Sequence, residues 1–153
     1  MAIRKIVTMG DEVLRKKSRP VVNFNEKLWQ LLDDMKDTMN KAEGVGLAAV
    51  QVGVLRRAIV IDVGEGLMEL INPEIIEVSG EQEGQEGCLS VPGRWGIVKR
   101  PNYVKLRAQN RKGQWKLYEG TELKARAFCH EIDHLDGKLF IDKGIMIERL
   151  ERD

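Results

Sequence analysis

The segment His130-Glu131-Ile132-Asp133-His134 contains the only two histidines of the chain and has the form of a metal-binding pentad. On an α-helix, side chains four residues apart lie one turn apart on the same face, so both imidazoles could bind one cation. Glu131 would then stand beside an open coordination position, where a carboxylate can act as a general base. This pattern is typical of a metal-dependent hydrolase, but it also occurs by chance on solvated helix surfaces.

A metal site of this kind needs a third ligand, and the sequence offers two sources. The metzincin pattern would place a third histidine at position 140, which is Phe140 here, so that class is excluded. A carboxylate near the C-terminus, from Glu148 or Glu151, would give a small zinc metallopeptidase of the gluzincin type. Alternatively, Cys88 could supply a thiolate and complete a Cys-His-His set.

Three separated blocks of the chain resemble the peptide deformylase family, in the family's order and spacing. They are Gly44-Val45-Gly46-Leu47-Ala48-Ala49-Val50-Gln51, Glu86-Gly87-Cys88-Leu89-Ser90, and the pentad with Leu135 and Gly137 after it. The resemblance covers nearly the whole chain. It implies a metalloenzyme that removes the formyl group from the N-terminal methionine of new bacterial proteins and releases formate. Its partners would be N-formylmethionyl peptides of nascent chains, with transient proximity to the ribosome.

The resemblance implies that Cys88, His130 and His134 hold one divalent metal. Neutral imidazoles and a thiolate suit Fe, Zn, Ni and Co rather than Ca or Mg, and the family implies Fe(II) as the native ion. Metal binding lowers the pKa of a water ligand towards neutrality. Glu131 would take a proton from that water, which attacks the formyl carbon, and would later pass the proton to the departing amine.

Attack on a formyl carbon creates an oxyanion, which needs fixed hydrogen-bond donors. By motif position, the resemblance assigns this role to the side-chain amide of Gln51 and the backbone N–H of Leu89. Three glycines, which also have a plain interpretation as turn residues, would let the backbone of a peptide approach closely and pair as an added strand. They are Gly44, Gly46 and Gly87.

The methionine side chain of a substrate would need an apolar pocket, for which family position suggests Val45, Leu123 and Ala127. Core packing is an alternative explanation for each of them. Arg94 could meet a substrate carbonyl, although exposed arginines usually have no such role. The chain departs from many family members at Cys129, where they have glutamine. Because one helical step turns a side chain by about 100°, Cys129 should point away from the metal and pack as a small hydrophobe.

The length fits one compact domain over residues 1–153, since a chain of this length can bury roughly 70% of its unfolded surface, and the resemblance implies that this domain is catalytic. The chain has 25 Lys and Arg against 24 Asp and Glu, which gives no general footprint for nucleic acid or an anionic membrane. The N-terminus lacks a signal peptide, and no run approaches the ~20 apolar residues of a membrane span. We therefore expect a cytoplasmic protein.

Two helices are predicted to flank a largely β middle. Residues 25–41 carry a helical stripe of Leu28, Leu31, Leu32, Met35 and Met39, with Asn25 as the cap. A second helix should begin after Thr121, carry the pentad and end near Gly137. Residues 144–150 suggest a short last helix.

Strands are expected at 58–63 and at 67–78, the second broken by Asn72-Pro73. Residues 104–109 and 115–118 suggest a hairpin. The predicted fold class is α+β, with antiparallel β structure packed around a central metal-binding helix and a second long N-terminal helix.

The sequence alone leaves two alternatives to a deformylase. One is the zinc metallopeptidase with a C-terminal carboxylate ligand, and the other is a non-catalytic binding module that a metal stabilises. The metal ligand set separates the first alternative, and the role of Glu131 separates the second.

Overall fold

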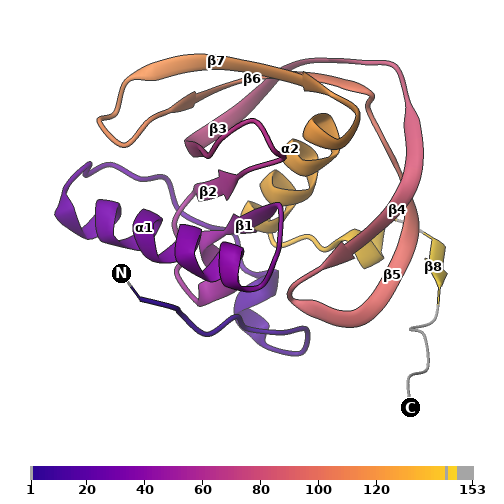
Figure 1. The fold of residues 1–153 in the computed structure, drawn as a ribbon, viewed down its shortest axis with the longest axis horizontal. Coiled ribbons are helices and arrows are strands. Elements are labelled where there is room, and N and C mark those ends of the chain that lie inside the picture. The colour runs from indigo at the N-terminus through magenta and orange to yellow at the C-terminus, as the bar shows by residue number, and fades with distance from the viewer. Residues whose placement is uncertain (1, 144, 148–153) are drawn as a thin grey trace.

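The computed structural model of the chain describes residues 2–143 and 145–147 (Figure 1). Within them, two α-helices, α1 (Glu26–Lys41) and α2 (Glu122–Leu135), pack against antiparallel sheets, which confirms the predicted α+β class. The described residues also form three short 3-10 helices: η1 (Glu12–Arg15), η2 (Ala49–Val52) and η3 (Phe140–Asp142). None of the helices in these residues is long and apolar enough to cross a membrane.

The larger sheet has five strands in the order β1-β2-β3-β6-β7, and all its neighbours are antiparallel. The strands are β1 (Gly46–Ala48), β2 (Ala58–Ile61), β3 (Met68–Ser79), β6 (Tyr103–Gln109) and β7 (Trp115–Thr121). The predicted hairpin is therefore confirmed as β6 and β7. The expected break at Asn72-Pro73 is wrong, because β3 continues past it through a register shift between Ile71 and Glu74.

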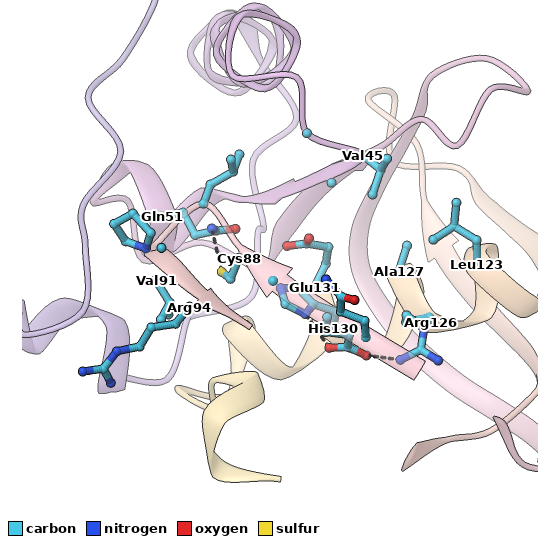
Figure 2. A pocket seen from close by; sticks show the side chains of 18 residues that line it. Val45, Gln51, Cys88, Val91, Arg94, Leu123, Arg126, Ala127, His130 and Glu131 are labelled. Carbon is cyan, nitrogen blue, oxygen red and sulfur yellow. Dashed lines mark hydrogen bonds and ion pairs between the residues drawn. The ribbon is translucent and has the colours of Figure 1, made fainter. Parts of the chain in front are cut away.

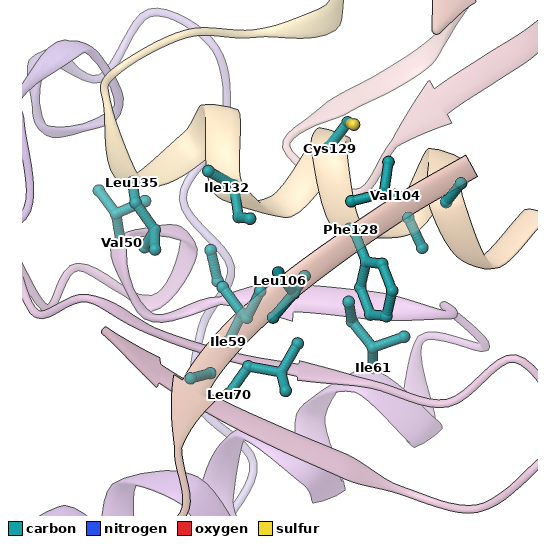
Figure 3. Packing of buried hydrophobic residues seen from close by; sticks show 14 residues of the cluster. Val50, Ile59, Ile61, Leu70, Val104, Leu106, Phe128, Cys129, Ile132 and Leu135 are labelled. Carbon is teal, nitrogen blue, oxygen red and sulfur yellow. The ribbon is translucent and has the colours of Figure 1, made fainter. Parts of the chain in front are cut away.

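Strand β2 lies between the two helices, which explains why it is apolar at every position. Ile59 and Ile61 join the cluster under α2, and Ala58 and Val60 join the cluster under α1. Figure 3 shows the first of these clusters, where Phe128 of α2 packs beside the strand residues. Side chains alternate across a strand, so one strand supplies both cores and fixes the two helices relative to each other.

The N-termini of the two helices differ in their capping. Asn25 caps α1 as predicted, because its Oδ1 accepts a hydrogen bond from the Leu28 N–H at 3.3 Å. Thr121 does precede α2, but its hydroxyl makes no cap bond, and Glu122 adopts a φ of 54°. The backbone N–H of Glu122 instead donates to the Asn102 carbonyl at 3.0 Å. A contact with the residue just before β6 thus replaces the expected cap.

The smaller sheet has the order β4-β5-β8, with β4 (Gln82–Cys88), β5 (Val91–Arg100) and β8 (Ile145–Ile147). It lies beside α2 (Figure 1). The predicted helix over 144–150 is wrong for residues 145–147, which pair with β5 as a strand. Residues 144 and 148–150 lie outside the described residues. Open backbone groups on the edge of β5 accept this strand, an interaction that local sequence does not encode.

Candidate metal centre

Three predicted ligands converge where the end of β4 meets α2. The candidate ligand atoms of Cys88, His130 and His134 all lie within 4.8 Å of one another. The Cys88 Sγ stands 3.2 Å from the His134 Nε2, and the two imidazole centroids are 5.0 Å apart. One thiol and two imidazoles at this spacing fit a borderline or soft divalent cation.

His130 is oriented by a buried carboxylate behind it. Its Nδ1 lies 3.0 Å from the Glu86 Oε1, which leaves its Nε2 for the cation. Arg100 donates hydrogen bonds to both carboxylate oxygens of Glu86, at 2.8 and 2.9 Å, and to Asp133 of α2 at 2.8 Å. The arginine and Glu86 side chains are at most 4% exposed. The imidazole of His130, a candidate metal ligand, is thus held in place by a buried network of charged side chains.

The electrostatics follow from burial and from these pairs. Burial raises the pKa of Glu86, but hydrogen bonds from Arg100 and His130 outweigh it and hold the pKa well below its ordinary value. Burial lowers the pKa of His134 to about 3, so its imidazole is neutral, as a metal ligand must be. Burial also opposes protonation of His130, but contacts with Cys88 and Glu86 raise its pKa above the ordinary value.

Glu131 is a buried carboxylate with a free oxygen. It is 4% exposed, and its Oε1 makes no hydrogen bond to any described residue. Its Oε2 lies against Gly46, where an added Cβ would stand only 2.6 Å away. Burial raises the pKa of Glu131 to about 7, which suits a group that must accept and release a proton near neutral pH.

Gln51 is held rigidly beside the cluster. Its Oε1 accepts from the Ala48 N–H at 2.9 Å, which fixes the orientation of the amide. Its Nε2 then donates to the Ser90 Oγ at 3.1 Å and points towards the Cys88 Sγ at 3.6 Å. An amide NH₂ carries two hydrogens, so this group can present a donor to the space beside the thiol.

These residues line one pocket of about 480 Å³, a size typical of a small-ligand site (Figure 2). Val45 and Leu123 are about half exposed at its wall, and Ala127 is buried. Arg94 lines it as well. Of the predicted site residues, His134 does not line the pocket and is buried. All the others line it: Gly44, Val45, Gly46, Gln51, Gly87, Cys88, Leu89, Leu123, Ala127, His130 and Glu131.

The positions of Cys129 and Phe140, near the pentad in sequence, show that each has a packing role. Cys129 is buried within the α2 core cluster and is not part of the metal-binding group, as predicted. In Figure 3 its thiol points away from the side chains of Ile59, Ile61 and Leu70, and burial raises its pKa to about 11. Phe140, where a metzincin would have its histidine, stacks on His130 with centroids 6.2 Å apart. Glu148 and Glu151 lie outside the described residues.

Sequence reasoning gave no role to Glu86, Arg100, Ser90 or Arg126, all of which contact site residues. For Arg126 a signal existed. It lies four residues before His130, the same spacing that joins the two histidines, so it had to lie on their helix face. Arg100 gave none, because its partners come together only in the folded chain.

A buried carboxylate beside a Cys-His-His cluster, in a pocket open to a small ligand, defines a metal-dependent hydrolase. The family model described as polypeptide deformylase matches residues 3–152. The chain therefore belongs to the peptide deformylase family, and it is an enzyme.

Relatives and solved structures agree with this assignment. A protein of Caldicellulosiruptor bescii named peptide deformylase is 61% identical over 145 residues, which is 95% of this chain and 87% of that protein. The crystal structure of a peptide deformylase from Legionella pneumophila superposes with a TM-score of 0.91 at 48% identity, over 93% of this chain and 86% of that one. A peptide deformylase from Ehrlichia chaffeensis, solved in complex with actinonin, gives 0.92 at 36% identity over 94% and 89%. The deformylase prediction is thus confirmed over the metallopeptidase and the binding module.

Proposed function

We propose that this chain hydrolyses the formyl amide of N-formylmethionyl peptides and releases formate. The observation that carries this proposal is the placement of the Glu131 carboxylate within the same pocket as Cys88 and His130. The apolar residues Val45, Leu123 and Ala127 in the lining of the same pocket support a small acyl group and one adjoining side chain as the ligand.

Cys88, His130 and His134 would hold one divalent cation, and α2 would be the central metal-binding helix. The donor set favours Fe(II), Zn, Ni or Co, with Fe(II) suggested by the family. A cation bound by these residues supplies Lewis acidity, which activates water and polarises a carbonyl.

Glu131 would carry the proton. In hydrolysis, a water oxygen forms a bond to the formyl carbon, the carbon–nitrogen bond breaks, and the nitrogen leaves as an amine. The Oε1 of Glu131, which bonds none of the described residues, can accept the water proton and then donate it to the departing nitrogen, so that formate and a free amino terminus result. Burial keeps bulk water from competing for this proton.

Gln51 and Leu89 would stabilise the developing oxyanion. The fixed Gln51 amide and the Leu89 backbone N–H line the pocket near Cys88, so neither donor must reorganise during the reaction. Gly44, Gly46 and Gly87 would admit the peptide backbone, and the methionine side chain would lie against the following residues: Val45, Leu123 and Ala127.

We infer one catalytic domain over 1–153, since α2 joins the metal ligands to the main core. Because formylmethionyl peptides arise at ribosomes, we expect the protein to act in the cytoplasm near the ribosome. The complex of the Ehrlichia chaffeensis relative supports actinonin as a ligand of this chain too.

The test is product analysis with the metal-loaded protein and formyl-Met-Ala-Ser. Mass spectrometry should show free Met-Ala-Ser and formate as the products, and actinonin should block their formation. Cleavage between Met and Ala would instead show a peptidase, and an unchanged substrate would reject the proposal.

A further inference from the structure

Helix α2 and strand β4 each contribute to the metal-binding group, so the group exists only if the two are held in register. Cys88 comes from the end of β4 and both histidines come from α2. The apolar contacts of the β4–β5 sheet are few, in a small cluster of Val91, Val98, Leu139 and Phe140. The attachment of β4 to α2 along the rest of the strand is therefore polar.

Arg126 makes three contacts of that attachment. Beside them, Gln82 donates to the Glu122 carbonyl at 2.8 Å and Glu86 bonds His130 at 3.0 Å. Its Nη1 donates to the Glu86 Oε2 at 2.9 Å, and its Nη2 donates to the Gln82 Oε1 at 2.9 Å. The same guanidinium lies 3.4 Å from the carbonyls of Gly84 and Val98. Residues 82, 84 and 86 alternate onto one face of β4, so a single side chain of α2 spans five residues of the strand. The dashed line to Arg126 in Figure 2 marks the Glu86 contact.

Gly84 leaves the room that this contact needs. A Cβ at residue 84 would stand 2.6 Å from the Arg126 Nη2 and 3.2 Å from its Cζ. The φ of Gly84 is not in the left-handed region, so the turn geometry does not require glycine. The close approach of the guanidinium does.

We propose that Arg126 is a positioning residue that locks β4 to α2 and thereby holds Cys88 and His130 at metal-binding distance. It acts through Glu86, which bonds Arg126 with one oxygen and His130 with the other. Arg126 and His130 are one helical turn apart, and Glu86 sits across both. This inference rests on the proposed function for its metal site and deepens it by a residue outside the ligand set.

The test is the affinity of the protein for Co(II) and Zn(II), measured by competition with a chelator. Arg126→Met keeps the aliphatic stem but removes the donors, and we expect it to weaken metal binding about 10- to 100-fold, as loss of outer contacts does in other sites. The absorption of bound Co(II) should lose intensity in its thiolate band. Arg107→Met is the matched control, because Arg107 forms an exposed ion pair with Glu74 on the five-stranded sheet.

Gly84→Ala is the second variant and leaves Arg126 in place. We expect it to weaken metal binding like Arg126→Met, and to add little when both changes are combined, since the clash vanishes with the guanidinium. Arg126→Lys should give an intermediate affinity, because one ammonium cannot bond both Gln82 and Glu86.

Metal affinities of Arg126→Met and Gly84→Ala within twofold of wild type, whatever their melting temperatures, would overturn the proposal. If Arg126→Met does not fold, Gly84→Ala and Arg126→Lys decide by the same measurement. Metal affinity is read without any substrate, so failure of wild type to release formate would reject the proposed function and leave this result intact.

Discussion

The carboxylate of Glu131 occupies the space that a side chain at Gly46 would need, with the Oε2 2.6 Å from the position of a Cβ. Strand β1 and helix α2 are therefore in contact where Gly46 of the strand faces the buried carboxylate of Glu131. Gly46 was predicted from the sequence as a contact for peptide backbone. In the structure Gly46 has a second role, because the absence of a side chain there leaves room for the carboxylate of Glu131, the proposed base.

Gly46→Ala should lower kcat by roughly 100-fold, since displacement of a catalytic group by about 1 Å has effects of that order. Steady-state kinetics with formyl-Met-Ala-Ser provide the measurement. Gly87→Ala is the control at the same pocket, because a Cβ there meets only the Arg94 carbonyl at 3.6 Å. It should leave kcat near wild type and raise KM. Equal kcat for Gly46→Ala and wild type would show that Glu131 is not constrained by this contact.

Cys88→Ala should weaken Zn(II) and Co(II) binding by more than about 100-fold, because losing a ligand exceeds the loss of an outer contact. The chain provides its own control in Cys129, its other free cysteine, which is buried in the core. Cys129→Ala should keep the metal affinity of wild type. Chelator competition measures both, and full retention of metal by Cys88→Ala would remove this residue from the ligand set.

Ala127→Leu should fill part of the pocket and change which formylated residue is accepted. Added methylenes in a pocket change discrimination by about 10- to 200-fold. We therefore expect the ratio of kcat/KM for formyl-Met-Ala-Ser over formyl-Ala-Ala-Ser to fall by roughly 10-fold or more. Comparing two substrates on one variant cancels any loss of active protein. An unchanged ratio would mean that the methionine side chain lies elsewhere.

Asp34 of α1 ties down the N-terminal segment, and its effect should depend on pH. It accepts hydrogen bonds from the Ala2 N–H at 3.0 Å, from Arg4 at 2.9 Å and from Gln30 at 2.7 Å. Burial raises its pKa, but these bonds outweigh burial and hold the pKa below the ordinary 3.8. A lowered carboxyl pKa stabilises the folded state above 3.8 and loses that effect as the pH falls through the lowered value.

Asp34→Asn should therefore reduce the free energy of unfolding by about 1 kcal/mol near neutral pH. The difference from wild type should shrink at pH values below 3.8. Urea unfolding at both pH values measures it, with Asp37→Asn on the same helix as the control. A difference that stays constant with pH would assign the effect to packing rather than to charge.

Residues whose partners are close in sequence were predictable. The Asn25 cap, the α1 stripe and the histidine pair each lie within one element, where spacing alone decides which side chains share a face. The β6–β7 hairpin also followed from two segments with alternating apolar residues around a polar turn.

Residues whose partners are distant in sequence were not. Residues 82–87 are all Gln, Glu or Gly, with low strand propensity, yet they form β4 because β5 pairs with them and two arginines bond Glu86. Residues 145–147 are a strand only because β5 offers an edge. The candidate metal ligands could be named from sequence, but the residues that orient them required the fold.

The central claim is that Glu131 moves the proton while Cys88, His130 and His134 hold the metal. The most direct measurement is formate release from formyl-Met-Ala-Ser by Fe(II)-loaded, anaerobically purified protein, with metal content determined on the same samples for wild type and Glu131→Gln. We predict that wild type releases formate, and that Glu131→Gln keeps its metal but loses turnover by about 100-fold or more. Turnover at the wild-type rate in a metal-loaded Glu131→Gln protein would contradict the account.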